Sequence, residues 1–242
     1  MTRPSRLVVV VPARGGSTRV PGKNMRTLAG RPLLGHTLRL AVDAGLGDRT
    51  VVSSDDGAAL ALAADFGVRG LMRPPEFATA EASTESVLLH VLDTLASDGV
   101  EVEWVMTLPP TSPFRQLETV RAMLRRVEDE PEASDCLMTV TEDRRDLWRM
   151  DAGGVMERLF PQAPRRQQDR SPLFEENSAV YLTKVAALRA TGSVLGRSVR
   201  GHVIDPIEAW DINTETDLVI AEALAPHRGV RVWSSDDAGH AR

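Results

Sequence analysis

The chain has 242 residues, of which 42% are hydrophobic and 26% are charged, and its formal net charge is −5. This composition is sufficient for one large domain with its own core. The negative charge argues against nonspecific binding to nucleic acid or to a membrane surface, so a polyanionic ligand would need local cations. A single cysteine excludes an internal disulfide. With no signal-peptide segment and no stretch long enough to cross a bilayer, we expect a cytoplasmic protein.

Residues 7–24, LVVVVPARGGSTRVPGKN, are the most informative stretch of the chain. The run opens with five apolar residues, four of them valine, which is typical of a buried strand because β-branched side chains suit a pleated surface. The loop that follows holds three glycines and three cations, Arg14, Arg19 and Lys23. Glycines let the backbone approach an anion with its N–H groups, and the cations add charge. Strand, glycine-rich basic loop and helix in succession indicate phosphate binding.

Two well-known phosphate-binding loops do not match this pattern. A Walker A loop has four residues between its glycine and the Gly-Lys pair, whereas five residues separate Gly16 from Gly22 here. Asn24 also stands where that loop needs Ser or Thr. The GxGxxG fingerprint of dinucleotide-binding proteins is absent. An ordinary connection between a strand and a helix is the plainer alternative.

The loop pattern PARGGSxxxPGKNxRxLxGxPLL resembles the signature of the cytidylyltransferases that make CMP-activated acidic sugars. It is most similar to the N-acylneuraminate (sialic acid) cytidylyltransferases and to the CMP-pseudaminate, CMP-legionaminate and CMP-Kdo synthetases. The resemblance implies an α/β fold of the Rossmann-like, GT-A-like nucleotidyltransferase type, a three-layer sandwich with a mostly parallel sheet and a dimerisation arm. It implies catalytic roles for Arg14 and Lys23. It also implies nucleotide contacts from Pro12, Ala13, Arg14, Gly15, Gly16, Ser17, Lys23 and Asn24.

A helix and a second strand follow the loop. Pro32 begins a helix whose apolar residues recur at helical spacing until Gly45, and residues 49–53 form a short buried strand. Asp55 and Asp56 come after this strand, at the carboxyl end where ligands bind in open α/β sheets. Asp56 is expected to cap the next helix. Asp55 is either a second capping residue or, as the resemblance implies, a nucleotide contact.

Residues 73–84 resemble the family's RPxELAxDxxS motif, which reads the cytosine ring. The resemblance therefore implies that Arg73 and Ser83 contact the nucleotide. The family's aspartate is replaced, because Ala80 or Glu81 stands at that point. Ser83 also has the position of an N-cap, since apolar residues at helical spacing follow it, and the two roles are compatible.

A further buried strand is expected at 104–108, and it leads into PPTSPFR at 109–115. This turn is similar to the family's LQPTSPLR and places Thr111 and Ser112 near the sugar. Pro109 stands where the family has a glutamine that faces the sugar. The replacement removes a hydrogen-bond donor and an acceptor, which favours an atypical sugar.

Residues 141–176 are charged, rich in Arg, Gln and Pro, and poor in long apolar periods, so on sequence alone they read as a flexible insertion. In the family this region is an arm that crosses to a second subunit, which implies a homodimer. Arg166 and Gln167 resemble the family's RQ(Q/D) piece, and a planar guanidinium suits a sugar carboxylate. A solvated arginine is the alternative. Asn177 opens NSAVY, which is similar to NGAIY, and is expected at the sugar; Ser178 stands where the family has glycine.

The segment WDINTETD at 210–217 resembles the family's D-I-D-T-x-x-D motif, whose two aspartates hold Mg²⁺. Alternate residues of an extended chain share a face, and Mg²⁺ (or Mn²⁺) is held by few protein carboxylates together with substrate phosphates. Asp211 is thus expected to be a catalytic metal ligand, with Asn213 as the second. An amide carries no charge, so we expect weaker metal affinity, unless Asn213 binds a metal-bound water. A closing helix is expected at 216–224.

These motifs predict one cytidylyltransferase domain at 5–225, with an inserted arm at 141–176 and a frayed tail at 226–242. The expected reaction transfers CMP from CTP to the anomeric hydroxyl of a sialic-acid-like nonulosonic acid and releases pyrophosphate. One alternative is a nucleotidyltransferase that uses another nucleotide or another acid acceptor. A second is a catalytically weakened relative that binds a nucleotide as a partner subunit. The motifs do not decide which acidic sugar is used.

Overall fold

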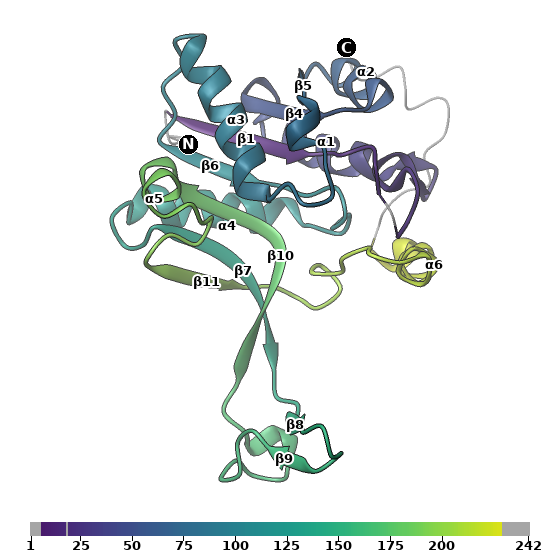
Figure 1. Ribbon diagram of the computed structural model, residues 1–242, viewed down its shortest axis with the longest axis vertical. Helices are drawn as coiled ribbons and strands as arrows, with labels where there is room; N and C mark the ends of the chain where they lie inside the picture. The colour runs from purple at the N-terminus through teal and green to yellow at the C-terminus, as the bar shows by residue number, and fades with distance from the viewer. Residues whose placement is uncertain (1–5, 18, 229–242) are drawn as a thin grey trace.

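The computed structural model describes residues 6–17 and 19–228, and its centre is a seven-stranded sheet with helices on both faces (Figure 1). The strand order is β11-β7-β10-β6-β1-β4-β5, and every neighbouring pair is parallel except those that β10 makes with β6 and β7. The predicted α/β class with a mostly parallel sheet is confirmed. The strands are β1 (Leu7–Pro12), β4 (Thr50–Ser54), β5 (Arg69–Met72), β6 (Trp104–Thr107), β7 (Cys136–Asp143), β10 (Leu173–Lys184) and β11 (Val199–Val203).

The two faces of the sheet carry separate apolar clusters, because successive residues of a strand point to opposite sides. Leu7, Val9 and Val11 of β1 pack with α1, α2 and α4 on one face. Val8 and Val10 pack with α3 and α5 on the other. β1 is therefore covered on both faces, as its valine run predicted. The helices are α1 (Leu33–Asp43), α2 (Gly57–Asp65), α3 (Thr84–Ser97), α4 (Leu117–Asp129), α5 (Val185–Thr191) and α6 (Glu215–Leu224).

A third apolar cluster fixes α6 beside the first loop. Leu28 belongs to a small hairpin, β2 (Thr27–Leu28) and β3 (Arg31–Pro32), and it shares this cluster with Phe114 before α4 and with Ile212 and Leu218. The expected closing helix is α6, and Thr214 caps it in a capping box with Asp217. The segment before α6 is thus held against both the first loop and the turn before α4.

The residues expected to form an arm are an ordered ribbon rather than a flexible insertion. β7 and β10 continue past the sheet as a two-stranded ribbon that ends in a hairpin of β8 (Trp148–Met150) and β9 (Met156–Arg158) (Figure 1). The register of β10 shifts between Glu176 and Tyr181, and Ser178 within this bulge has a φ of 59°. The left-handed region costs a non-glycine residue about 1–2 kcal/mol, which accounts for the glycine usual at this position in the family.

β5, α5 and β11 had no expected counterpart, and neither had the short hairpins β2–β3 and β8–β9. β5 and β11 are the edge strands of the sheet and are mostly exposed, so they lack the apolar runs that mark buried strands. Of the predicted tail, Ala225–Arg228 forms a 3₁₀ turn after α6, and residues 229–242 lie outside the described residues. Within the described part of the chain, no helix combines the length and apolar character needed to span a membrane.

Candidate active site

A pocket of about 480 Å³ opens at the carboxyl ends of β1 and β6, between the first loop, the segment before α3 and the turn after β6. Ligands of open α/β sheets bind at this edge. Several residues predicted for the nucleotide or the sugar line it together: Pro12, Arg14, Ser17, Lys23, Asn24, Arg73, Ser83 and Thr111. The remaining lining residues are Arg19, Thr79, Ala80, Ala82, Thr84, Val87, Pro109 and Pro110.

The cations of the first loop are held by oxygens from other segments of the pocket wall. Arg14 Nη1 donates to Thr79 O at 2.7 Å, across the pocket. Lys23 Nζ donates to Ile212 O at 2.8 Å. Burial lowers the pKa of Lys23, and the charges of Arg19 and Arg14 act in the same direction, while nearby carboxylates oppose them. Positive charge is thus concentrated on one loop of an acidic protein, which suits a polyanionic ligand.

The loop backbone is fixed by two side chains, those of Asp55 and Asn24. Asp55 Oδ1 accepts from Gly15 N at 2.8 Å, and Asn24 Nδ2 donates to Arg14 O at 2.8 Å. A Cβ at Gly15 would lie 3.1 Å from Asp56 Cβ, so this close approach favours glycine. Of the predicted nucleotide residues, Ala13, Gly15, Gly16 and Asp55 are not among those that line the pocket. Asp55 instead orients the loop.

The helix predicted to begin at Pro32 is α1, which starts at Leu33, but other structure separates it from the basic loop. Gly22 has a φ of 61° and turns the chain into a short 3₁₀ turn at Lys23–Met25. The β2–β3 hairpin follows, and α1 begins only at Leu33. No helix therefore starts directly at the end of this loop in the described chain, so its positive potential comes from side-chain charge rather than from an adjoining helix N-terminus.

Arg73 and Ser83 line the pocket and also have structural roles. The Arg73 side chain is buried, with the residue only 5% exposed, and its Nη2 donates to Ser53 O at 2.7 Å. Burial lowers the pKa of its guanidinium. Ser83 Oγ accepts from Ser86 N at 3.1 Å as the N-cap of α3, so capping and pocket lining coexist in this residue.

The residues predicted for the sugar lie in three different places. Thr111 lines the pocket, and its carbonyl accepts from Ile212 N at 2.9 Å. Ser112 is buried, and the described residues offer its Oγ no hydrogen-bond partner. Asn177 lies in the β10 bulge, where its Oδ1 accepts from Thr139 Oγ1 at 2.7 Å. Arg166 is exposed on the arm.

The two predicted metal residues are hydrogen-bonded to each other. Asn213 Nδ2 donates to Asp211 Oδ2, and Asn213 Oδ1 accepts from Arg19 Nη2 at 3.1 Å. Among the described residues, no group of three or more His, Cys, Asp or Glu side chains is placed to hold a metal ion. A cation here would rest on Asp211 and on oxygens that the substrate brings, and Asn213 would ligate it only after releasing Arg19.

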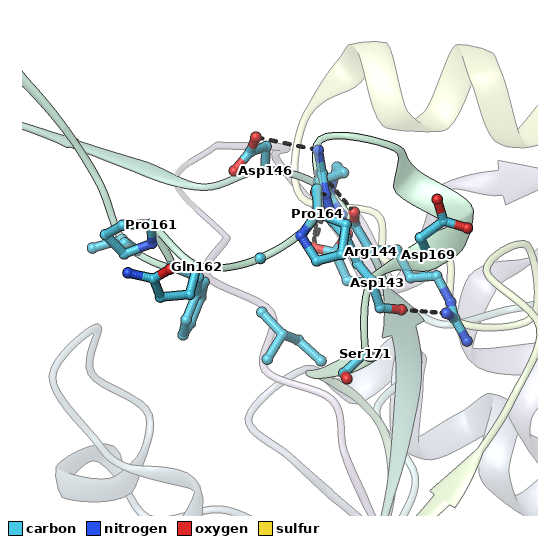
Figure 2. A pocket seen from close by; sticks show the side chains of 14 residues that line it. Asp143, Arg144, Asp146, Pro161, Gln162, Pro164, Asp169 and Ser171 are labelled. Atoms are coloured by element: carbon cyan, nitrogen blue, oxygen red, sulfur yellow. Dashed lines mark hydrogen bonds and ion pairs between the residues drawn. The ribbon is translucent and has the colours of Figure 1, made fainter.

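The arm contains a second pocket, of about 670 Å³, between the ribbon strands and residues 159–164 (Figure 2). Asp146 organises it by accepting from Arg158 at 2.8 Å and from Arg170 at 3.2 Å. Neither Arg166 nor Gln167 lines this pocket or the one beside the first loop. One chain on its own does not bring these two predicted sugar contacts to the loop cations.

Two buried charged residues at the site had no assigned role from the sequence. Arg115 donates from Nη1 to Pro109 O at 2.6 Å and to Ala179 O at 3.0 Å. Glu208 Oε1 accepts from Gln116 N at 3.0 Å, at the start of α4. Glu208 stands in an irregular segment that gives no periodic signal of burial. The sequence feature that could have indicated burial of Arg115 was its place in the PPTSPFR motif, next to an apolar residue.

The fold and this pocket define an α/β protein that presents clustered cations to a polyanion at the carboxyl edge of its sheet. The family model described as cytidylyltransferase matches residues 8–183. The chain belongs to the cytidylyltransferase family, and it is therefore a nucleotidyltransferase. This confirms the resemblance seen in the first loop.

Individual relatives agree with this assignment. The chain is 29% identical to a CMP-N,N'-diacetyllegionaminic acid synthase of Legionella pneumophila, over 90% of this chain and 96% of the relative. It is 24% identical to an N-acylneuraminate cytidylyltransferase of Escherichia coli, over 90% of this chain but only 51%, about half, of that protein's length. The fold is similar to that of a CMP:2-keto-3-deoxy-manno-octonic acid synthetase in complex with CTP, with a TM-score of 0.65, 19% identity, and 92% and 99% of the two chains covered.

Replacing Asp217 with asparagine should loosen the turn that carries Asp211. Asp217 Oδ2 accepts from Asn213 N at 2.9 Å and from Thr214 N at 2.7 Å. Burial acts to raise the pKa of Asp217, but these hydrogen bonds outweigh it and lower the pKa below 3.8. We expect Asp217→Asn to reduce the free energy of unfolding by about 1 kcal/mol at pH 7, the usual cost of a lost cap.

Because the folded-state pKa is depressed, the stabilisation by Asp217 is present above the pKa of the unfolded chain and is lost as the pH falls through the folded-state value. Urea unfolding from pH 7 to pH 2 should show the difference between wild type and Asp217→Asn shrinking below about pH 4. Asp129→Asn, at the exposed end of α4, is the matched control and should change stability by less than about 0.5 kcal/mol. A difference that stays constant down to pH 2 would contradict this role of Asp217.

Proposed function

We propose that this protein transfers CMP from CTP to the anomeric hydroxyl of an acidic α-keto sugar of the nonulosonic type and releases pyrophosphate. The observation that carries the proposal is the convergence of Arg14, Arg19 and Lys23 on one pocket at the carboxyl edge of the sheet. The match to a CMP-N,N'-diacetyllegionaminic acid synthase over 96% of that relative supports the choice of acceptor class. The use of CTP supports the cytoplasmic location expected from the sequence.

In the proposed reaction the anomeric oxygen forms a bond to the α-phosphorus of CTP. The bond between the α-phosphorus and the oxygen bridging to the β-phosphate breaks, pyrophosphate leaves, and the hydroxyl proton passes to solvent. Negative charge shifts onto phosphate oxygens, so catalysis rests on positioning and electrostatic stabilisation. Arg14 and Lys23 are placed to supply that stabilisation, once the triphosphate replaces Thr79 O and Ile212 O as their partners.

The residues before α6 fit a divalent cation that arrives with the nucleotide. Asp211 supplies one carboxylate, which is enough for Mg²⁺ when phosphate oxygens and waters complete the coordination. Asn213, already bonded to Asp211, would orient that carboxylate or ligate the ion with its amide oxygen. When bound, Mg²⁺ (or Mn²⁺) would neutralise charge on the phosphates.

The acceptor side of the proposal needs a second copy of the chain. Arg166 and Gln167 are proposed to bind the sugar carboxylate, yet they lie on an arm that extends away from the sheet (Figure 1). The arm exposes large apolar side chains, with Met150 and Val155 each 67% exposed. Contiguous exposed apolar surface of this kind is typical of a protein interface. We therefore propose a homodimer in which each arm completes the acceptor site of the partner.

Pyrophosphate release tests the proposed function directly. Wild-type protein with Mg²⁺ and a panel of α-keto acid sugars should release pyrophosphate from CTP, and much less from ATP, GTP or UTP. Arg14→Ala should lower the rate between several-fold and a thousand-fold, the range for a lost group that stabilises charge. Arg189→Lys, in an exposed ion pair with Asp93, is the control and should keep the wild-type rate.

Two results would speak against the proposal. If the folded protein binds CTP but releases no pyrophosphate with any sugar of the panel, this would favour another acceptor or a nucleotide-binding subunit without catalysis. Equal release from ATP would favour a different nucleotide.

If the arm forms the dimer interface, charged side chains introduced on its surface should dissociate the dimer. Trp148 and Met156 are exposed on β8 and β9, so the double change Trp148→Glu, Met156→Glu places charge on the proposed interface. Sedimentation velocity should show a dimer for wild type and a monomer for the variant, because buried charge without a partner is costly. The monomer should retain CTP binding and lose transfer to the sugar. A wild-type monomer with full activity would refute the shared site.

A further inference from the structure

Arg115 is buried behind the 109–111 turn, which forms the wall of the pocket opposite the first loop. Its side chain comes from the residue after Phe114 and is buried, with the residue 6% exposed. Nη1 donates to Pro109 O and to Ala179 O, and Nη2 donates to Thr37 Oγ1 at 2.5 Å. One guanidinium thus connects α1, the turn after β6 and the bulge of β10, which are far apart in the sequence.

Arg115 also brings a charge to the segment before α6. Burial lowers the pKa of its guanidinium to about 9, while the carboxylates of Asp211 and Glu208 act in the opposite direction. These carboxylates are the charged groups that face Arg115 in the described structure. The charges of these carboxylates partly offset the burial of the guanidinium, while its hydrogen bonds go to neutral oxygens.

The segments that Arg115 joins contain hydrogen-bonding groups that remain unused. Ser112 Oγ, Arg115 Nε and Asn177 Nδ2 are buried, and the described residues provide no partner for them. Each such group costs about 1–3 kcal/mol, and native proteins rarely keep several together without a reason such as a function or a bound water. These three groups lie next to the proposed acceptor site. We infer that the contacts of Arg115 hold this wall in a geometry that leaves the three polar groups without partners.

We propose that Arg115 is a positioning residue for the acceptor: its guanidinium fixes the 109–112 turn and the 177–179 bulge to each other and places a positive charge near Asp211. The inference rests on the proposed function, since the wall matters for catalysis only if a sugar is aligned there with the α-phosphorus. A displacement of about 1 Å in such an alignment is enough to lower a rate by about a hundred-fold. The loop cations bond Thr79 O, Asn213 Oδ1 and Ile212 O, none of which Arg115 contacts, so we expect its loss to affect the nucleotide less than the acceptor.

Steady-state kinetics of the Arg115→Lys variant test whether Arg115 acts on the acceptor side rather than on the nucleotide side. Lysine keeps the charge, but a compact ammonium cannot reproduce the planar fork that reaches three oxygens. We expect kcat to fall at least tenfold and the acceptor KM to rise, while the Kd for CTP changes less than threefold. Thr37→Val removes one contact from outside the pocket and should shift kcat and acceptor KM in the same sense, by a smaller factor. Arg189→Lys is the matched control for replacing arginine by lysine on the surface.

Amide hydrogen exchange of the same variants, without substrate, tests the positioning independently of the reaction. Arg115→Lys should speed exchange in residues 111–112 and 177–181 at least tenfold, and Arg189→Lys should leave it unchanged. If wild type transfers CMP to no acidic sugar, the proposed function fails, and exchange still decides whether Arg115 holds the wall.

Three results would overturn the inference. Wild-type kcat and acceptor KM in Arg115→Lys would show that the fork is unnecessary. Equal losses of CTP affinity and acceptor affinity would show a general structural role. If Arg115→Lys does not fold, Thr37→Val decides alone, and wild-type kinetics together with unchanged exchange in that variant would contradict the proposal.

Discussion

Like charges on one loop are the constraint on which the rest of the site depends. Arg14, Arg19 and Lys23 repel one another. Arg14 is held by Thr79 O, whereas Arg19 and Lys23 are held by oxygens of Asn213 and Ile212. The loop therefore joins the segment before α3 to the segment before α6. β1, buried on both faces, anchors the base of this arrangement. A triphosphate would replace neutral oxygens with charged ones, so ligand binding relieves the repulsion that the protein alone only moderates.

The two sides of the pocket are stabilised by different kinds of interaction. The nucleotide side consists of loop cations and backbone fixed by Asp55 and Asn24. The opposite wall depends on one buried guanidinium, Arg115, and on the carboxylates that compensate it. Asn213 bridges the sides, because it bonds both Arg19 and Asp211. An amide at this position ties a cation to a carboxylate without adding charge, which distinguishes the site from one built on two aspartates.

The sequence was informative where local pattern decides structure. The valine run of β1 and the N-caps at Asp56 and Ser83 follow from side-chain chemistry and were predicted, whereas the mostly parallel sheet was predicted from the family resemblance. The exposed edge strands β5 and β11 lack an apolar pattern and were missed. The arm at 141–176 was expected from the resemblance, but composition alone indicated a flexible insertion, because strand pairing between its two halves stabilises it rather than a local apolar period.

In the candidate site, too, local motifs were predicted and the results of long-range contacts were not. Motif resemblance predicted half of the residues that line the pocket, because these residues belong to short contiguous motifs. It did not predict that Asp55 serves the loop backbone or that Arg115 and Glu208 are buried, since these are consequences of long-range contacts. Gly22, with its positive φ, leads into a 3₁₀ turn and the β2–β3 hairpin, and no element was expected from the sequence between the loop and the helix that begins at Pro32.

A crystal structure of the protein with CTP tests the central claim most directly. The account predicts triphosphate oxygens within hydrogen-bond distance of Lys23 Nζ and Arg14, with Arg14 released from Thr79 O and the cytosine ring near Arg73 and Ser83. Phosphates bound outside the first loop, with Arg14 and Lys23 still on Thr79 O and Ile212 O, would contradict it.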